Sequence, residues 1–260
     1  MSQTDPPSGE KQQQTEDDDL REGLVGLSRL ESARLPLEEL LTAVAGFAVR
    51  AIPGADGAGL TLLEDDRANT IVATAAFVTE IDAVQYGIGQ GPCITAAAEG
   101  ETVLSGSLGA DPRWRQFGGR IARMGVHSVV SLPLITPDKV VGAMNVYAHA
   151  KNAFDERAAA LGQVFAGPAA IAVQNAQILE QTRRLADRLQ ATLDERMVIE
   201  RAIGVIMSRS GVGEAEARHR LVALSQHEHQ KLTVVAANLI DEAVRRARGR
   251  TAPGGSGPGR

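Results

Sequence analysis

The feature that most constrains the fold is a set of regularly spaced residues near the end of the chain. Nine positions follow one another at alternating intervals of four and three: Ile178, Thr182, Leu185, Leu189, Thr192, Arg196, Ile199, Ile203 and Ile206. This spacing keeps the residues on one face of a long helix and is typical of a coiled-coil seam. We predict a helix that pairs with a second copy of the chain, with Ile178, Leu185, Leu189 and Ile199 in the seam. The alternative is an amphipathic helix that packs on its own chain.

The segment before this helix mixes helical and extended patterns. Apolar residues at helical spacing predict a helix over 37–49, with Pro36 suited to its first turn. Strands are predicted over 57–63, 70–77, 102–104, 126–134 and 139–147. The first two strands and the last two are predicted to form hairpins. The order of elements indicates an α+β fold, with an antiparallel sheet flanked by helices.

Shorter helical and loop signals lie between the hairpins. Three glycines at alternate positions, Gly87, Gly89 and Gly91, predict a loop with unusual backbone angles over 85–93. They are not interpreted as a dinucleotide-binding fingerprint, which needs a strand before the glycines and a helix directly after the third, a pattern that Pro92-Cys93 is not expected to continue. Short helices are predicted near 96–98, after the capping residue Asp111, and over 117–124. A longer helix is predicted from Phe154, interrupted or bent at Gly167-Pro168.

Composition predicts how the chain is divided. Residues 1–19 contain no aliphatic or aromatic residue after Met1, so we expect a disordered tail over 1–35 that runs into the first helix. Glycine and proline dominate 249–260, which we expect to be a second disordered tail. The two folded domains are then expected at 36–180 and 181–248.

Charge is distributed unevenly between these segments. The whole chain has a net charge of −5, which argues against a general nucleic-acid coat protein. Residues 1–35 carry a net charge of −4 and residues 36–180 one of −6, whereas residues 181–250 carry +4. An anionic partner is therefore expected to contact the last segment.

Several functional classes lack support in the sequence. A single cysteine, Cys93, excludes an intramolecular disulfide and is interpreted as a core residue in preference to a redox sensor. There is no apolar run of roughly 20 residues and no secretory signal, so a cytoplasmic protein with no membrane contact is expected. No catalytic motif is present, and His219, His227 and His229 are explained without a metal. We expect no enzyme activity, no metal and no cofactor.

The C-terminal segment resembles the ANTAR domain, a three-helix RNA-binding module of bacterial antitermination regulators. The first helix of that family carries a pattern close to Ile-Glu-x-Ala-Lys-Gly-x-x-Met, and residues 199–207 here read Ile-Glu-Arg-Ala-Ile-Gly-Val-Ile-Met. The resemblance implies binding to a pair of stem-loops in a nascent transcript, which would prevent a terminator hairpin from forming. The implied RNA-binding residues are Arg196, Arg201, Ala202, Gly204, Arg209, Arg218 and Lys231.

Residues 36–180 resemble a GAF domain, a small-molecule sensor module, of the kind that precedes ANTAR modules in actinobacteria. The motifs that carry the resemblance are residues 54–57, the glycine-rich stretch 87–93, residues 111–114, and the paired segments 131–134 and 141–147. The family's ligand cavity lies between the sheet and the segment of loops and short helices. The resemblance therefore implies a pocket near Gly89, Gly91, Cys93, Trp114, Val129 and Asn145, although many such domains serve only in dimerisation.

These observations predict a dimeric transcription antiterminator with a GAF domain for sensing, dimerisation or both. Two departures from the ANTAR pattern keep a second hypothesis open: Ile203 stands where the family has lysine, and Arg218 where it usually has an aromatic residue. The alternative is a ligand-regulated protein-interaction module with no RNA activity. A regulatory subunit of a sensor enzyme is a further alternative, for which the chain contains no catalytic segment.

Overall fold

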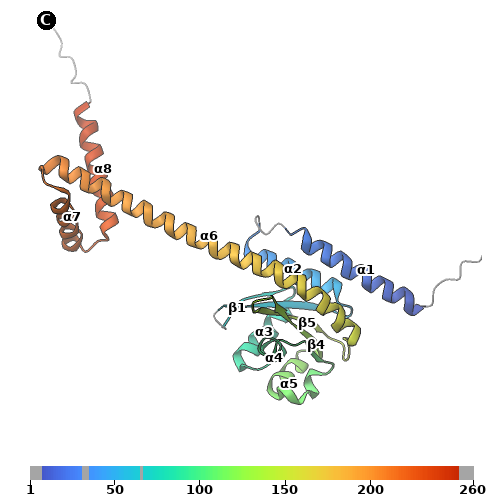
Figure 1. Ribbon diagram of the computed structural model, residues 1–260. Helices are drawn as coiled ribbons and strands as arrows, with labels where there is room; N and C mark the ends of the chain where they lie inside the picture. The colour runs from blue at the N-terminus through green and yellow to red at the C-terminus, as the bar shows by residue number, and fades with distance from the viewer. Residues whose placement is uncertain (1–7, 31–34, 65–66, 252–260) are drawn as a thin grey trace, which may run out of the picture. The chain divides into compact units, whose positions relative to one another are not determined.

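The computed structural model describes residues 8–30, 35–64 and 67–251 (Figure 1). Contacts divide the chain into two compact units, Met1–Gln181 and Thr182–Arg260. The division falls within α6 (Glu156–Ser210), a helix of 55 residues that contributes to the core of each unit.

The described part of the first unit is built on a five-stranded antiparallel sheet with strand order β2-β1-β5-β4-β3. Its strands are β1 (Gly57–Glu64), β2 (Arg67–Ala73), β3 (Val103–Ser105), β4 (Ser128–Ile135) and β5 (Val140–Ala148). The pairs β1–β2 and β4–β5 are the two hairpins that the sequence predicts. The prediction of an α+β fold with an antiparallel sheet is confirmed.

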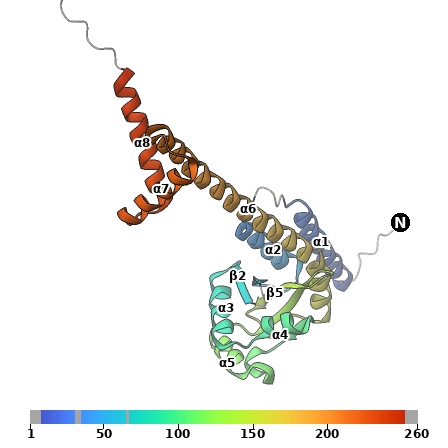
Figure 2. The same ribbon diagram turned by 60° about the vertical axis from the view of Figure 1, so that its left-hand side comes forward.

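Alternation along the strands directs side chains into two separate cores. Leu60, Leu132 and Val146 face α2 (Leu37–Ala51) and the first part of α6, in the larger core. Val129 and Tyr147 face the opposite layer. That layer contains α3 (Ala76–Ile88), α4 (Pro92–Glu99), η1 (Leu108–Ala110), η2 (Pro112–Trp114) and α5 (Arg115–Arg123). Figures 1 and 2 show the helices on the two faces of the sheet.

The N-terminal segment corrects the prediction of a disordered tail, because residues 8–28 form the helix α1 (Ser8–Ser28). Leu20, Leu24 and Leu27, at intervals of four and three, pack against the larger core. The acidic part of α1 also has a cationic partner: Arg157 Nε lies 2.7 Å from Glu16 Oε2, and its Nη2 lies 2.7 Å from Asp17 Oδ1. Composition alone does not reveal these partners. The remaining tail positions, 1–7, 31–34 and 252–260, lie outside the described residues.

Three other local predictions are wrong. The strand predicted over 70–77 ends at Ala73, and Phe77 belongs to α3, most of which the sequence analysis missed. The predicted glycine loop is reduced to the short link between α3 and α4, where Gly89 takes a left-handed conformation with φ of 74°. The predicted interruption at Pro168 is also wrong, since α6 is continuous there. Pro168 is exposed, while Phe165 and Ala169 on either side are buried and hold the helix on the sheet.

The described part of the second unit is helical, as the sequence predicts. The end of α6 packs with α7 (Glu214–Glu228) and α8 (Leu232–Thr251). Its buried core is made largely of small residues, which allow close approach between helices: Ala202, Ile203, Ala217, Leu221, Val235 and Ala236. The expected three-helix arrangement after a long helix is confirmed.

Adjacent glycines in α5 provide a matched test of the packing in the smaller core. A Cβ atom on Gly118 would collide with the backbone carbonyl of Leu108, whereas one on Gly119 would meet nothing within 4 Å. Gly118→Ala is expected to lower the free energy of unfolding by about 1–3 kcal/mol, the usual cost of overpacking. Gly119→Ala, the control, is expected to be neutral or stabilising by up to about 1 kcal/mol, since alanine favours a helix. Urea denaturation measures both, and equal effects would contradict the described packing.

Candidate functional site

The second unit exposes a set of basic side chains on the helices around its core. Arg201 and Gly204 are exposed on α6, one turn apart, and there is open space beside Gly204. Arg209 is exposed near the end of the same helix, and Lys231 is exposed immediately before α8. These groups are accessible to the phosphates of a nucleic acid.

A groove between α6 and α7 contains two more of the predicted basic residues. Its volume is about 490 Å³, and it is lined by Thr192, Glu195, Arg196, Ile199, Glu200 and Arg218. Arg218 Nη2 lies 2.8 Å from Glu200 Oε1 on α6 and 3.2 Å from Glu214 Oε1 on α7. These ion pairs raise the pKa of Arg218, mainly through the hydrogen bond to Glu200. The guanidinium is therefore oriented across the groove while it remains partly exposed.

Ala202 is placed differently from the prediction of an RNA-contacting residue. It is fully buried between the helices of the second unit, so RNA cannot reach it without opening the core. Ile203 is buried in the same core. The replacement of the family's lysine by Ile203 thus adds an apolar packing contact and leaves the exposed face of the helix unchanged.

The predicted seam is exposed over only part of its length. Ile178, Leu185 and Leu189 have 54%, 58% and 59% of their surface exposed. Ile199 instead packs against the core of the second unit, so its assignment to the seam is corrected: the helix face that carries the seam turns into that core. Leu193 and Met197, which the sequence analysis did not assign, are also exposed. They continue from Leu189 at intervals of four.

A candidate ligand cavity lies on the smaller-core side of the sheet, but most of its lining residues differ from those predicted. The cavity has a volume of about 610 Å³ between the sheet and the helices α3 and α4. Its walls are formed by Thr61, Leu63, Tyr86, Cys93, Ile94, Ala97, Ala98, Lys139, Val140 and Ala143. Of the six predicted pocket residues, Cys93 alone lines it.

The other five predicted pocket residues lie around the cavity. Gly89 is exposed at the C-terminus of α3, and Gly91 is buried at the N-terminus of α4. Trp114 is buried, and its Nε1 donates to Thr95 Oγ1 over 3.1 Å. Val129 and Asn145 are fully buried in the sheet. None of the five is among the residues that line the cavity. Alternation along β1 was the available signal for the missed Thr61 and Leu63, which share one face of the strand.

A network of buried polar groups lies beside the inner end of the cavity. Tyr86 Oη donates to Thr61 Oγ1 over 2.7 Å and lies 3.4 Å from Cys93 Sγ. Ser131 Oγ donates to Asn145 Oδ1 over 2.7 Å. Burial raises the pKa of the Cys93 thiol and that of the Tyr86 phenol, so both groups are neutral near pH 7. The described groups that act most on this thiol are Tyr86, Asn145, Asp82 and Thr61, and none of them is a cation that would activate it.

Asp82 is buried at the edge of this network. Burial raises the pKa of its carboxyl to about 7, against the smaller opposite effect of the hydrogen bond that Tyr147 Oη donates over 3.3 Å. Asp82 Oδ2, Gln85 Nε2 and Asn145 Nδ2 have no hydrogen-bond partner among the described residues. Such buried orphan atoms mark a place where polar contacts from a further molecule would lower the free energy.

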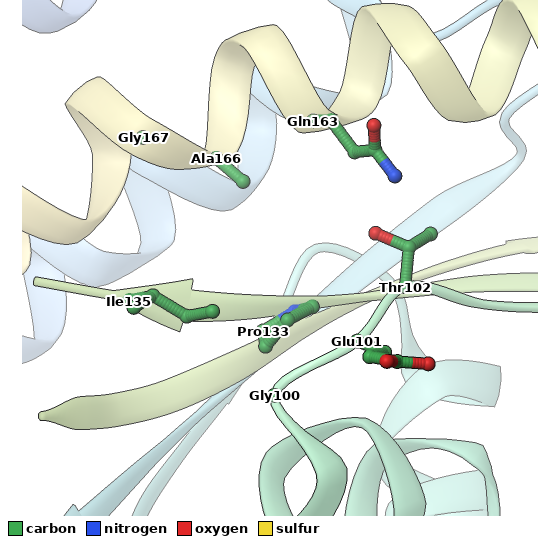
Figure 3. A pocket seen from close by; sticks show the side chains of 8 residues that line it. All are labelled: Gly100, Glu101, Thr102, Pro133, Ile135, Gln163, Ala166 and Gly167. Atoms are coloured by element: carbon green, nitrogen blue, oxygen red, sulfur yellow. The ribbon is translucent and has the colours of Figure 1, made fainter.

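A second groove lies at the opposite edge of the sheet. It has a volume of about 520 Å³ between the end of β4, the turn before β3 and α6. Figure 3 shows Thr102 and Gln163 facing one another across it, with Pro133 and Ile135 on β4. It contains none of the predicted site residues. Among the described residues, no group of His, Cys, Asp and Glu side chains is arranged to hold a metal ion. No helix in the described part of the chain has the length and apolar character needed to span a membrane.

Solved structures resemble the first unit at low sequence identity. The GAF domain of a phosphoenolpyruvate-protein phosphotransferase from Coxiella burnetii is 17% identical and has a TM-score of 0.50; the match covers 64% of this chain and 96% of that one. The free methionine-R-sulfoxide reductase from Neisseria meningitidis is 16% identical and has a TM-score of 0.45; the match covers 68% and 95%. The first likeness shows a shared fold. No curated protein matches the chain.

Family comparisons cover both units. The profile of the GAF domain matches residues 34–174, which is more than half of the chain. The profile of the ANTAR domain matches residues 187–240, a range that contains every buried core residue of the second unit. The chain therefore belongs to the GAF domain family and carries a C-terminal ANTAR domain, an RNA-binding antitermination module.

Proposed function

We propose that this protein is a homodimeric transcription regulator that acts by antitermination, binding paired stem-loops in nascent transcripts. The observation that carries the proposal is the match of the ANTAR profile to a helical unit with exposed arginines and a net positive segment charge. RNA hairpins are recognised through phosphate contacts, shape and unpaired bases, which suits such a surface. The protein is therefore proposed to act in the cytoplasm, bound to transcripts while they are being synthesised.

Two groups of basic residues form the proposed RNA-binding surface. Arg201, Arg209 and Lys231 are exposed around the core, and open space beside Gly204 allows a loop to approach the helix backbone. Arg196 and Arg218 belong to the groove between α6 and α7. Because the ion pairs of Arg218 are exposed and screened by solvent, they stabilise the fold only weakly and allow exchange with a phosphate.

The proposed dimer forms through α6. Every residue from 181 to 197 is exposed, and Leu185, Leu189 and Leu193 carry apolar side chains that are 58–60% exposed. A helical segment without tertiary packing is only marginally stable in water, so a partner helix would supply the missing burial. The GAF domain then senses a signal, strengthens the dimer, or does both. A two-state change in helix pairing would transmit its state to the ANTAR domains.

The proposal includes no catalytic activity. The single thiol, Cys93, is buried and protonated near pH 7, and the pKa of Asp82 reflects burial in a structural network. Both domain families are typically regulatory. The rival function is a protein-interaction module that is regulated by a ligand and does not bind RNA. The salt dependence of binding separates the two functions. Affinity for RNA falls steeply as the salt concentration rises, because salt cations compete with the protein's basic side chains for the phosphates.

The double variant Arg201→Glu, Lys231→Glu tests the RNA-binding surface. Its affinity for an RNA with two tandem stem-loops is expected to fall on the order of a hundredfold, because each reversal replaces attraction to phosphate with repulsion. A gel-shift titration measures this loss at several salt concentrations. The control variant is Arg115→Glu, Arg120→Glu, which makes the same charge change on α5 of the GAF domain. Full affinity in the ANTAR variant, or an equal loss in the control, would count against the assignment.

The double variant Leu185→Glu, Leu189→Glu tests the seam. Four added charges in a dimer would repel one another across the helix pair, so a shift to monomers is expected. The control, Gln190→Glu with Ala191→Glu, adds the same charge at exposed positions on the side of the helix away from the seam and is expected to leave the dimer intact. Sedimentation velocity measures the mass of each variant, and circular dichroism verifies the fold. A wild-type protein that is monomeric at micromolar concentration would contradict the proposed dimer.

A further inference from the structure

The cavity of the GAF domain has an apolar body and an uncharged inner end. Leu63, Ile94, Ala97, Val140 and Ala143 form most of its wall. The alanines leave room that larger side chains would fill, and the volume of about 610 Å³ suits a small organic molecule. Burial of an apolar ligand against this wall would supply most of its binding free energy.

Among the described residues that line the inner end, none offers a cation to an anionic ligand. The groups there are the Thr61 hydroxyl, the Tyr86 phenol and the Cys93 thiol, and burial keeps the last two neutral. The nearest titratable carboxyl behind them is Asp82, which acts on Tyr86 and Cys93 electrostatically. A phosphate or carboxylate placed here would lose its hydration without gaining a countercharge, and this loss costs several kcal/mol.

Lys139 does not change this conclusion. It lines the mouth of the cavity from the exposed turn between β4 and β5, where solvent screens its charge. Asp138, the residue before it in the same turn, is also exposed and carries the opposite charge.

The polar groups at the inner end favour a hydrogen-bond acceptor on the ligand. The Thr61 hydroxyl accepts from Tyr86 and acts as a hydrogen-bond donor toward the Cys93 thiol. Because a thiol sulfur is a weak acceptor, a carbonyl oxygen on a ligand would compete with it for the Thr61 proton. The Asn145 amide is fully buried behind the cavity wall and acts as a hydrogen-bond donor toward the same thiol. Asn145 pairs across the sheet with Gly59 on β1. Because Gly59 has no side chain, the Asp82 carboxyl group can lie against it: a Cβ atom on Gly59 would be only 2.8 Å from Asp82 Oδ2.

We propose that this cavity binds an uncharged, mainly apolar small molecule that carries a carbonyl or similar acceptor, with Thr61 as the donor to it. The proposal gives a ligand class to the sensor role and rests on that role. It excludes nucleotides and other phosphate-bearing ligands. Binding would fix α4 against the sheet through Ile94 and Ala97.

The test uses the full chain and a matched pair of probes, acetophenone and benzoate, which share a ring and differ in charge. Cys93 is the only cysteine, so methyl methanethiosulfonate labels this site alone, and intact mass reports the rate. Acetophenone at millimolar concentration is expected to slow labelling at least about fivefold and to raise the melting temperature, because it occupies most of the sites. Benzoate is expected to do neither.

Two variants test whether acetophenone protects Cys93 by binding in this cavity or by a general effect on the protein. Thr61→Val removes the donor at nearly constant volume and is expected to reduce protection by acetophenone severalfold. Ala97→Leu fills the cavity and is expected to abolish protection; the melting temperature of each variant without probe shows whether it folds. Equal or stronger protection by benzoate would overturn the ligand class and leave the sensor role standing. Protection by neither probe would overturn the cavity as a site, while RNA binding is judged separately by the gel-shift assay.

Discussion

The structure depends on one continuous helix whose buried face changes along its length. In its first part, α6 buries Phe165 and Ala169 against the sheet, and in its last part it buries Ala202 and Ile203 between α7 and α8. The stretch between these parts is exposed on all sides, yet it is rich in leucine. A helix that is anchored at both ends and unsupported in the middle needs a partner for its apolar side chains. For this reason the dimer is central to the proposed function.

Charge and burial assign different partners to the two domains. The ANTAR domain keeps its arginines at the surface, where Glu200 and Glu214 orient Arg218 without removing it from solvent. The GAF domain keeps its polar groups inside, where burial makes the Cys93 thiol and the Tyr86 phenol neutral. Exposed arginines suit a polyanion such as RNA, whose counterions they displace on binding. The second arrangement suits an uncharged molecule that loses little hydration when it is buried.

Periodicity in the sequence was sufficient for much of the fold. The residue patterns of 57–63 and 139–147 predict strands, and both segments form strands in the sheet between the two cores. The ANTAR pattern predicts the three-helix unit. The helix α1 was missed because its stability depends on distant groups, the larger core and Arg157, that composition does not reveal. Ala202 was misassigned for a similar reason: a small residue in a helix suits close approach by RNA and by another helix equally well.

The cavity shows where sequence reasoning reaches its limit. Glycines and Trp114 marked the correct region, but the lining depends on which face of each strand meets α3 and α4. That choice is set by strand register, such as the pairing of Thr61 with Ala143, which joins segments far apart in the chain. Register of this kind follows from the packing of the whole domain.

Crosslinking of the full-length protein to RNA in the cells that produce it, followed by sequencing of the bound fragments, tests the central claim most directly. The account predicts enrichment of transcript leaders that contain two adjacent stem-loops ahead of a terminator. Recovery of RNA without such paired hairpins, or of no more RNA than a variant lacking residues 182–260, would contradict it.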